Sequence, residues 1–323
     1  MRQTYGVRPS PGSDILIKSP ISDYHPQHHQ RYLNIISKAL DLAADFPNGS
    51  SRLRHFVDQN KESHALLYPY YKTTLLGLIS EFPKFPIVER LKILRYVTQG
   101  IKELHDKGWL HLDVKSDNIL INWESLSSNS ETNDRSQVVT SAVLSDFDLG
   151  LKIPHMPNSS GYKTIQLKHP VGNVQWRSPE AQTGLGLTKA SDVYSFALVC
   201  LYILGTSEYL LISPEKRQQL IRENIPDELE MFVRHMCFFE PTKKDFEWLV
   251  KHMAGDETWE ERLRTAFERG KRVLEKHPDQ RLSCWGQEMG DEMVRLVLEM
   301  TRMDPRRRLM IGEVLESEGF ELG

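Results

Sequence analysis

The sequence predicts an α+β protein, with a small, partly β N-terminal part (residues 1–69) and a mainly helical remainder (residues 70–323). Two observations support this fold class. Near the N-terminus, "DILIKSP" is a short apolar run closed by proline, which suits a strand, and "HALLYPYY" is typical of a buried strand. From residue 87 onward, apolar residues recur instead at helical spacing. With 323 residues, the chain is long enough for one large domain or two lobes with a sizeable core.

The N-terminal part is predicted to alternate between strand and helix. A strand is expected over residues 14–20, and "HHQRYLNIISKAL" (28–40) repeats its apolar residues at helical spacing. The stretch "PNGSS" breaks this pattern, and residues 64–71 are predicted to form a buried strand. A strong amphipathic helix is predicted over residues 87–105, because one of its faces carries Leu91, Leu94, Val97, Ile101 and Leu104.

Two further short strands, "ILINW" (119–123) and "VVTSAVLSDFD" (138–148), are expected in the second part. The Ser/Asn-rich stretch between them, residues 124–137, has no periodicity and is predicted to be a mobile surface loop. The most apolar window, "FALVCLYILG" (196–205), is too short to span a bilayer and is predicted to be a buried helix. Charged helical segments follow it to the C-terminus.

Composition narrows the function classes. The formal net charge of −3 gives no electrostatic reason to expect nucleic acid or an anionic membrane as a partner. The three cysteines are far apart, which argues against a disulfide framework or a structural zinc site. The first fourteen residues contain no apolar signal-peptide region. An intracellular protein, cytoplasmic or nuclear, is therefore expected. Composition gives no indication of the oligomeric state.

One short turn concentrates reactive groups. The stretch "HLDVKSDN", residues 111–118, has the pattern His-x-Asp-x-Lys-x-x-Asn, which average residue usage would produce in about one chain in a thousand of this length. A lone aspartate in a turn is usually a cap or a surface acceptor. Together, however, Asp113, Lys115 and Asn118 offer a carboxylate for a hydroxyl proton, a cation for a phosphate and a metal ligand, as phosphoryl transfer requires.

Supporting pieces follow in order along the chain. "LSDFDLG" places Asp146 after a β run, where its carboxylate could complete a Mg²⁺ site with Asn118. "GNVQWRSPE" ends in Glu180, Asp192 starts the apolar helix, and "DPRRRL" contains Arg308. With these pieces in place, the chain resembles the protein-kinase superfamily, most closely the degenerate kinase-like domains of filamentous fungi. The resemblance runs from about residue 15 to 320 and is strong from residue 87 onward.

The resemblance implies a two-lobe fold, with a reduced N-lobe over residues 1–69 and a C-lobe over residues 70–323. It also implies ATP and Mg²⁺ as ligands and a protein substrate. By position, Asp113 matches the catalytic-loop aspartate that acts as general base, and Lys115 matches the lysine that serine/threonine kinases place on the γ-phosphate. Asn118 and Asp146 match the two Mg²⁺ ligands. His111 would be structural.

Two further structural roles follow from the same resemblance. Glu180 and Arg308 would form a buried ion pair that braces the substrate loop, and its loss would leave a stranded charge. Asp192 would start the central helix of the C-lobe.

The N-terminal part matches less closely. Lys18 in "ILIK" matches the lysine that holds the α- and β-phosphates, although a lysine that closes a short strand is also an ordinary edge residue. "LLYPYY" matches the hinge, with Tyr68 as gatekeeper and Pro69 contributing only its carbonyl. Tyr71 would then donate its N–H to adenine, and Leu120 would form part of the pocket floor.

Several positions depart from the family pattern. No G-x-G-x-x-G precedes residue 15, so the strand–Gly-loop–strand that covers the phosphates is expected to be absent or truncated. No acidic residue lies between Tyr24 and Leu40, so Lys18 has no evident glutamate partner on the following helix. Asp148 replaces the glycine of the DFG triplet, Ser178 replaces the alanine of APE, and Leu112 replaces the usual arginine before the catalytic aspartate.

Two hypotheses therefore remain open from the sequence. The first is an ATP-dependent serine/threonine kinase, which the four retained residues of the catalytic loop and the metal site favour. The second is a pseudokinase that binds nucleotide or a protein partner without transferring phosphate, which the N-terminal departures favour.

Overall fold

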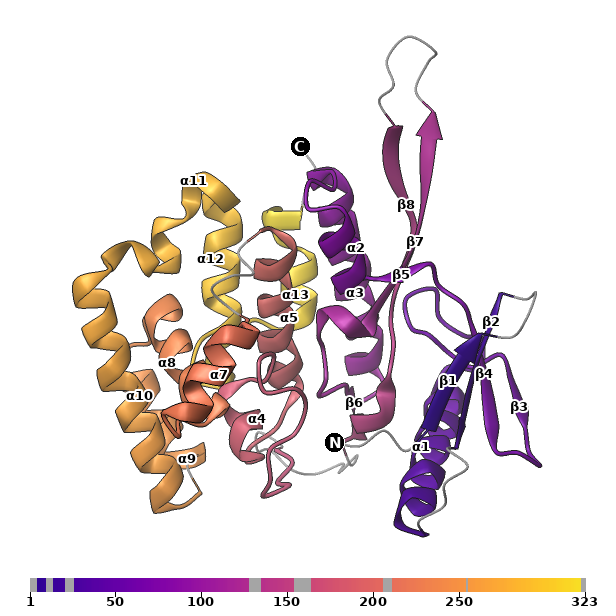
Figure 1. Ribbon diagram of the computed structural model, residues 1–323, viewed down its shortest axis with the longest axis horizontal. Coiled ribbons are helices and arrows are strands. Elements are labelled where there is room, and N and C mark those ends of the chain that lie inside the picture. Colours follow the sequence, from indigo (N-terminus) through magenta and orange to yellow (C-terminus); the bar gives the residue numbers. More distant parts are fainter. Residues whose placement is uncertain are drawn as a thin grey trace.

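The computed structural model describes residues 5–9, 14–20, 26–127, 135–153, 164–205, 211–253 and 255–320. Figure 1 shows a small sheet and one helix at one end of the molecule and a large group of helices at the other. No helix in the described ranges has both the length and the apolar character needed to cross a lipid bilayer.

The small end is a four-stranded antiparallel sheet that carries one long helix, α1 (Pro26–Asp45). The strand order is β1-β2-β4-β3, with β1 Tyr5–Pro9, β2 Ile15–Pro20, β3 Asp58–Asn60 and β4 Ala65–Pro69. Residues 15–20 and 65–69 therefore form strands, close to the predicted ranges. Strand β1 was not expected from the sequence. It pairs antiparallel with β2 from Tyr5↔Pro20 to Pro9↔Leu16, so one strand precedes β2.

Helix α1 is fastened to this sheet by a buried tyrosine. The Tyr32 hydroxyl oxygen lies 2.8 Å from the main-chain oxygens of both Lys18 and His64. Burial raises the pKa of this phenol well above its ordinary value, with the nearby Asp148 carboxylate adding to the effect. The hydroxyl thus stays protonated and links β2 to α1.

A three-stranded sheet joins the two ends of the molecule. It contains β5 (Thr73–Thr74), β7 (Ile119–Ser127) and β8 (Arg135–Leu144), in the order β5-β7-β8. The prediction of a loop over residues 124–137 is wrong at both ends, because β7 continues to Ser127 and β8 begins at Arg135. Cross-strand hydrogen bonds satisfy the backbone there even though the side chains are polar. The middle of the predicted loop, residues 128–134, lies outside the described residues. Figure 1 shows this hairpin projecting from the molecule.

The predicted strand over residues 138–148 is also too long. Strand β8 ends at Leu144, and Phe147–Leu149 form a single 3-10 turn, η2. The short strands β6 (Trp109–Leu110) and β9 (Leu151–Lys152) then pair with each other on either side of the polar turn and η2. This pairing brings the two motif-bearing segments together.

The remainder is helical, as predicted. Helix α3 (Ile87–Asp106) matches the predicted amphipathic helix closely, and its buried face includes Leu94, Val97, Ile101 and Leu104. The other helices are α2 Leu75–Glu81, α4 Pro179–Thr183, α5 Lys189–Ile203, α7 Pro214–Arg222, α8 Asp227–Phe239, α9 Lys243–Met253, α10 Glu257–Lys276, α11 Gly286–Met289, α12 Asp291–Met300 and α13 Ile311–Leu315.

Helix α5 is the buried axis of the helical end. Thirteen of its residues after Ala190, up to Ile203, are buried, as expected for the apolar window. A capping box starts it, because Thr188 Oγ1 accepts the N–H of Ala190 and Ser191 Oγ accepts the N–H of Thr188. This cap fixes where the helix begins and so fixes the position of Asp192 in its first turn.

One continuous apolar core joins the helices to the three-stranded sheet. It contains residues from α3, α5, α8, α9 and α12 and also Ile119, Ile121 and Leu144 of the sheet. Leu42 of α1 and Leu53 of the following segment belong to the same core. The segment after α1 therefore packs against the large end, and Leu53 also forms an isolated β-bridge with Leu144.

Candidate active site

The polar turn, residues 111–118, lies between β6 and β7, and its backbone is held by the buried carboxylate of Asp192. Asp192 Oδ2 accepts the N–H of His111, and its Oδ1 accepts the N–H of Leu112, both at 2.8 Å. His105 Nε2 lies 3.0 Å from the same Oδ2. Burial by itself would raise the pKa of Asp192, but the hydrogen bond from His105 and the neighbouring His111 hold it below its ordinary value. Asp192 is thus ionised and fixes the backbone of the turn.

His111 fixes the same turn from within. Its Nε2–H donates to the main-chain oxygen of Ser145 at 3.0 Å, while its Nδ1 accepts the N–H of Asp113 at 3.2 Å. The ring therefore ties the turn to the segment after β8. Leu112 has φ +62°, in the left-handed region that a branched side chain rarely adopts. The hydrogen bond to Asp192 holds it in that conformation.

The Asp113 carboxylate is fixed through both oxygens. Its Oδ1 accepts the N–H of Asn173 at 3.1 Å, and its Oδ2 accepts Nδ2 of Asn118 at 3.0 Å. Lys115 Nζ lies 2.8 Å from Oδ2. Gly172 allows Asn173 to approach, since a Cβ on this glycine would lie only 2.4 Å from the Leu112 oxygen. Asp113, Lys115 and Asn118 are thus brought into one constellation.

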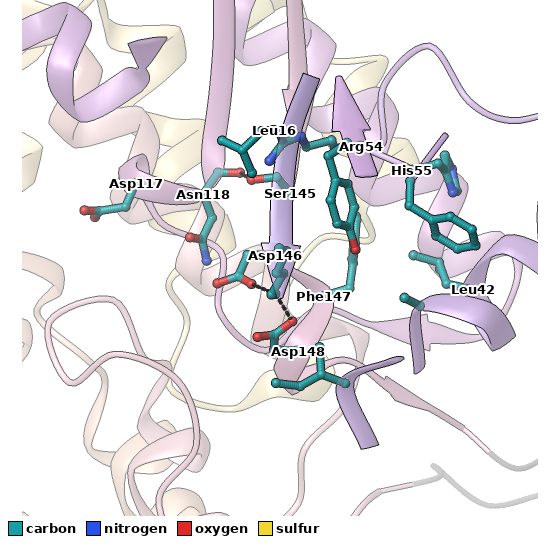
Figure 2. Close-up of a pocket in the computed structure, with 15 residues that line it drawn as sticks. Leu16, Leu42, Arg54, His55, Asp117, Asn118, Ser145, Asp146, Phe147 and Asp148 are labelled. Carbon is teal, nitrogen blue, oxygen red and sulfur yellow. Dashed lines mark hydrogen bonds and ion pairs between the residues drawn. The ribbon is translucent and has the colours of Figure 1, made fainter. Parts of the chain in front are cut away.

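A cavity of about 200 Å³ opens above this constellation, between β2, α1 and the segment that follows β8. Figure 2 shows its lining side chains. Lys18, Asn118 and Asp146 line it, as do Tyr68 and Leu16. Tyr71, which was expected to donate its N–H to adenine, and Leu120, which was expected to form part of the pocket floor, are not among the described residues that line it.

Lys18 contributes a buried ammonium to this cavity. Its Nζ lies 3.3 Å from Asp146 Oδ1 and 2.6 Å from Asp148 Oδ1, and the two aspartates are labelled next to each other in Figure 2. Burial alone would raise the pKa of Asp146, but the charge of Lys18 and its hydrogen bond keep that pKa below the ordinary value. Asp146 therefore presents an ionised carboxylate at neutral pH. Its φ of +67° turns it out of the strand and into the cavity.

Helix α1 presents a cation, not a carboxylate, to the same region. Lys38 Nζ donates to the main-chain oxygen of Asp148 at 2.8 Å. Burial lowers the pKa of Lys38, and the Asp148 carboxylate partly offsets this effect. Ile35 and Ala39 of α1 line the cavity with apolar groups.

The residues present are compatible with a Mg²⁺ ion that is shared with a phosphate. Asn118 Nδ2 donates to Asp113, so its side-chain oxygen is the atom that can face a metal ion. Asp146 adds an ionised carboxylate beside it in the cavity. In the described part of the chain, no group of three or more His, Cys, Asp or Glu residues is arranged to hold a metal. Two oxygen donors suit Mg²⁺, which usually completes its octahedron with phosphate and water.

The segment expected to form the hinge is already engaged by an arginine. Arg54 donates from Nε to the main-chain oxygen of Pro69 at 3.1 Å, and its Nη2 donates to the same oxygen. The guanidinium carbon lies 5.0 Å from the ring centre of Tyr68 and 5.9 Å from that of Tyr71. Arg54 also lines the cavity beside Leu16, as Figure 2 shows.

Glu180 and Arg308 form a fully buried, bidentate ion pair. Arg308 Nη1 lies 2.6 Å from Glu180 Oε1, and Nη2 lies 2.9 Å from Oε2. Ser191 Oγ donates to Glu180 Oε1 at 2.8 Å. Burial alone would raise the pKa of Glu180, but Arg308 holds it below its ordinary value. The pair fastens α4, α5 and the segment before α13 to one another.

Three residues near the site were not singled out in the sequence: Arg54, Lys38 and Asn173. Arg54 lies in an irregular segment with no motif, and Lys38 looks like an ordinary surface residue of an amphipathic helix. Asn173 contributes a main-chain N–H, which any residue but proline could supply. Asp148 stands out in the sequence because it replaces the glycine of the DFG triplet in "DFD".

Comparisons with known proteins bear on the family and fold of the chain. The family model described as the protein kinase domain matches residues 51–320. Among solved structures, a chain in the yeast RNA Pol II CTD kinase CTDK-1 complex superposes with a TM-score of 0.62. The superposition covers 100% of this chain and 94% of that one, at 15% identity, so it shows a shared fold.

The curated relatives are distant and much longer. Mouse dual specificity testis-specific protein kinase 1 is 27% identical over 202 residues, which is 59% of this chain and 30% of that protein. A probable serine/threonine-protein kinase of Dictyostelium discoideum is 24% identical over 185 residues, 54% of this chain and 10% of that protein. Ephrin type-A receptor 5 of Gallus gallus is 30% identical over 125 residues, 39% of this chain and 10% of that protein. The chain thus spans less than a third of the length of these relatives.

Proposed function

Since the chain belongs to the protein kinase family, we propose that it transfers the γ-phosphate of ATP to serine or threonine hydroxyls of a protein substrate. One observation carries the proposal. The Asp113 carboxylate is held through both oxygens, by Asn173 and Asn118, with the Lys115 ammonium 2.8 Å away. This reaction needs little beyond positioning and charge stabilisation, and such an arrangement supplies both.

The residues then take distinct roles. Asp113 orients the incoming hydroxyl and accepts its proton. Lys115, whose only charge partner within 4 Å among the described residues is Asp113, is placed to stabilise the phosphoryl group as it passes. Asn118 and Asp146 would hold Mg²⁺, which supplies neutralising charge to the phosphates. Lys18 would contact the phosphates from the opposite wall of the cavity.

The choice of serine and threonine as acceptors rests on Lys115 and on the relatives. Serine/threonine kinases carry a lysine at this position of the catalytic loop. The Dictyostelium relative is named as a serine/threonine-protein kinase, and the mouse relative as a dual specificity kinase.

The experiment uses three peptides that differ only in the acceptor residue, which is Ser, Thr or Tyr. We expect phosphate on the Ser and Thr peptides, read by mass spectrometry, and background on the Tyr peptide. Asp146→Asn serves as the control, because it removes the metal-holding carboxylate and is expected to abolish transfer. Transfer to the Tyr peptide alone would contradict the acceptor assignment.

A specific observation also supports a second candidate, a pseudokinase scaffold that binds a protein or nucleotide without transfer. Arg54 holds the Pro69 carbonyl, which would otherwise accept the N6 amino group of adenine. The cavity, at about 200 Å³, is below the roughly 300–1,000 Å³ typical of small-molecule sites. If Mg-ATP binds to the wild type and none of the three peptides is phosphorylated, this second candidate holds.

A further inference from the structure

The aspartate that replaces glycine in "DFD" makes the shorter of the two contacts between Lys18 and the carboxylates of this segment. Its Oδ1 lies 2.6 Å from Lys18 Nζ, against 3.3 Å for Asp146 Oδ1. Both partners are shielded, since the side chain of Lys18 is 9% exposed and that of Asp148 is 19% exposed. An ion pair this shielded from water is stronger than a surface pair.

The carboxylates of α1 lie elsewhere. The helix has two, Asp41 and Asp45. Asp45 accepts hydrogen bonds from Trp109 and Lys152, and Asp41 is exposed. The charged group of α1 in this region is the Lys38 ammonium, which donates a hydrogen bond to the main-chain oxygen of Asp148. Helix α1 therefore holds Asp148, and Asp148 holds Lys18.

The backbone accepts a side chain at this position. Among the described residues with positive φ, the segment contributes Asp146, and Asp148 is not one of them. A glycine is thus not required at residue 148 on conformational grounds.

We propose that Asp148 is a positioning residue that fixes the Lys18 ammonium in the phosphate-facing wall of the cavity, in place of a carboxylate from α1. This inference rests on the proposed function. The two aspartates then have different roles: Asp148 makes the shorter contact with Lys18, and the contact of Lys18 with Asp146 is through Oδ1, which leaves Asp146 Oδ2 for a metal ion. A fixed ammonium stabilises developing phosphate charge better than a mobile one, because no reorganisation is needed during the reaction.

The first test does not need phosphate transfer. The full-length chain is treated with acetic anhydride, and acetylation of Lys18 is followed by mass spectrometry relative to the exposed Lys61. Asp148→Asn frees the ammonium from its nearer carboxylate, so we expect Lys18 to be acetylated about fivefold faster. Asp148→Glu keeps the charge, and Asp41→Asn removes an exposed carboxylate from α1, so both should match the wild type. An unchanged Lys18 rate in Asp148→Asn would overturn the proposal.

The second test measures catalysis. Asp148→Asn and Asp148→Gly should each lower kcat by about tenfold while changing the Kd for Mg-ATP much less, because positioning is lost and binding is largely kept. The glycine variant is informative, because it restores the family's usual residue and is still expected to be slower. A rise in kcat in either variant would overturn the proposal, since it would mean that the Asp148 charge opposes the phosphates. Faster Lys18 acetylation in a chain that transfers no phosphate would support the positioning role and contradict the proposed function.

Discussion

Among single residues, the side chains at the two ends of the cavity differ in whether their binding groups are already occupied by other residues. The end of the cavity that is proposed to hold the phosphates is lined by Lys18, Asn118 and Asp146, and the Lys18 charge keeps the pKa of Asp146 below its ordinary value. At the end proposed to hold the base, Arg54 donates to the Pro69 oxygen and lies against the rings of Tyr68 and Tyr71. Burial lowers the pKa of Arg54, but an arginine stays charged at any physiological pH. A base that used the Pro69 oxygen as its acceptor would therefore have to displace a charged donor.

Replacing Arg54 with alanine tests this competition. Arg54→Ala frees the Pro69 carbonyl and enlarges the cavity, so we expect the Kd for Mg-ATP to fall by about tenfold, or about 1.4 kcal/mol. Arg52→Ala is the matched control, because Arg52 lies two residues away and binds Gln99 and Tyr96 outside this cavity. Isothermal titration calorimetry gives both values. Weaker binding in Arg54→Ala would mean that the guanidinium contacts the nucleotide and does not block it.

At the scale of elements, the polar turn and the segment before α4 are joined by an apolar cluster. Leu112 of the turn packs in the same cluster as Leu110, Val171, Ala181 and Leu187. The family usually carries an arginine at the position of Leu112. Such an arginine binds a phosphate on the activation segment through charge-assisted hydrogen bonds. Here the two segments are held by packing, so their arrangement does not depend on a phosphate at this position.

This packing leads to a prediction about regulation. Treatment of the purified chain with a broad-specificity phosphatase should change its peptide-phosphorylation rate by less than about twofold, because Leu112 has no charge with which to bind a phosphate. Intact-mass measurement before and after treatment confirms that phosphate was removed. A large fall in the peptide-phosphorylation rate after dephosphorylation would contradict this prediction, because it would mean that another cationic side chain binds the phosphate.

Elements were predictable where a local pattern determines them. The amphipathic stripe of α3 gives its bounds to within one residue, and "HLDVKSDN" identifies the polar turn from the sequence alone. The extended β7–β8 hairpin was missed because its polar residues lack apolar alternation, while its backbone pairing alone makes it a strand. The contact of Asp148 with Lys18 spans 130 positions and depends on where α1 places Lys38. The Arg54 contact to Pro69 depends in the same way on the path of an irregular segment.

At the scale of the whole molecule, the core contains a histidine that must remain neutral. His235 of α8 is buried against the rings of Tyr194 and Phe239. Burial lowers its pKa from 6.5 to about 3, and the nearby Arg234 and Arg308 act in the same direction. In the unfolded chain this imidazole takes up a proton near its ordinary pKa. The unfolded state therefore binds more protons below pH 6.5, and stability falls as the pH falls toward 3.

Replacing this histidine should flatten the acid side of the stability profile. Buried carboxylates such as Glu180, with a depressed pKa, contribute stability that is lost only below about pH 4.5, so the interval above that value reports on histidines. Between about pH 6 and pH 5, His235→Phe should reduce the slope of the unfolding free energy by up to about 1.4 kcal/mol per pH unit. His55, whose pKa burial also lowers, leaves a residual slope.

Urea unfolding at a series of pH values gives these slopes. His277→Phe, at an exposed position after α10, is the matched control and should keep the wild-type slope. Equal slopes for His235→Phe and the wild type would contradict the assignment of a neutral core histidine.

The proposed role of Asp113, to accept the hydroxyl proton in phosphoryl transfer, is tested most directly by single-turnover kinetics. Asp113→Asn keeps the shape of the side chain and removes its basicity, so Mg-ATP should bind with wild-type affinity. Transfer to the serine peptide should slow by about a hundredfold or more. Asp106→Asn, at the exposed end of α3, should transfer at the wild-type rate. Transfer by Asp113→Asn at the wild-type rate would contradict the role of Asp113 as proton acceptor.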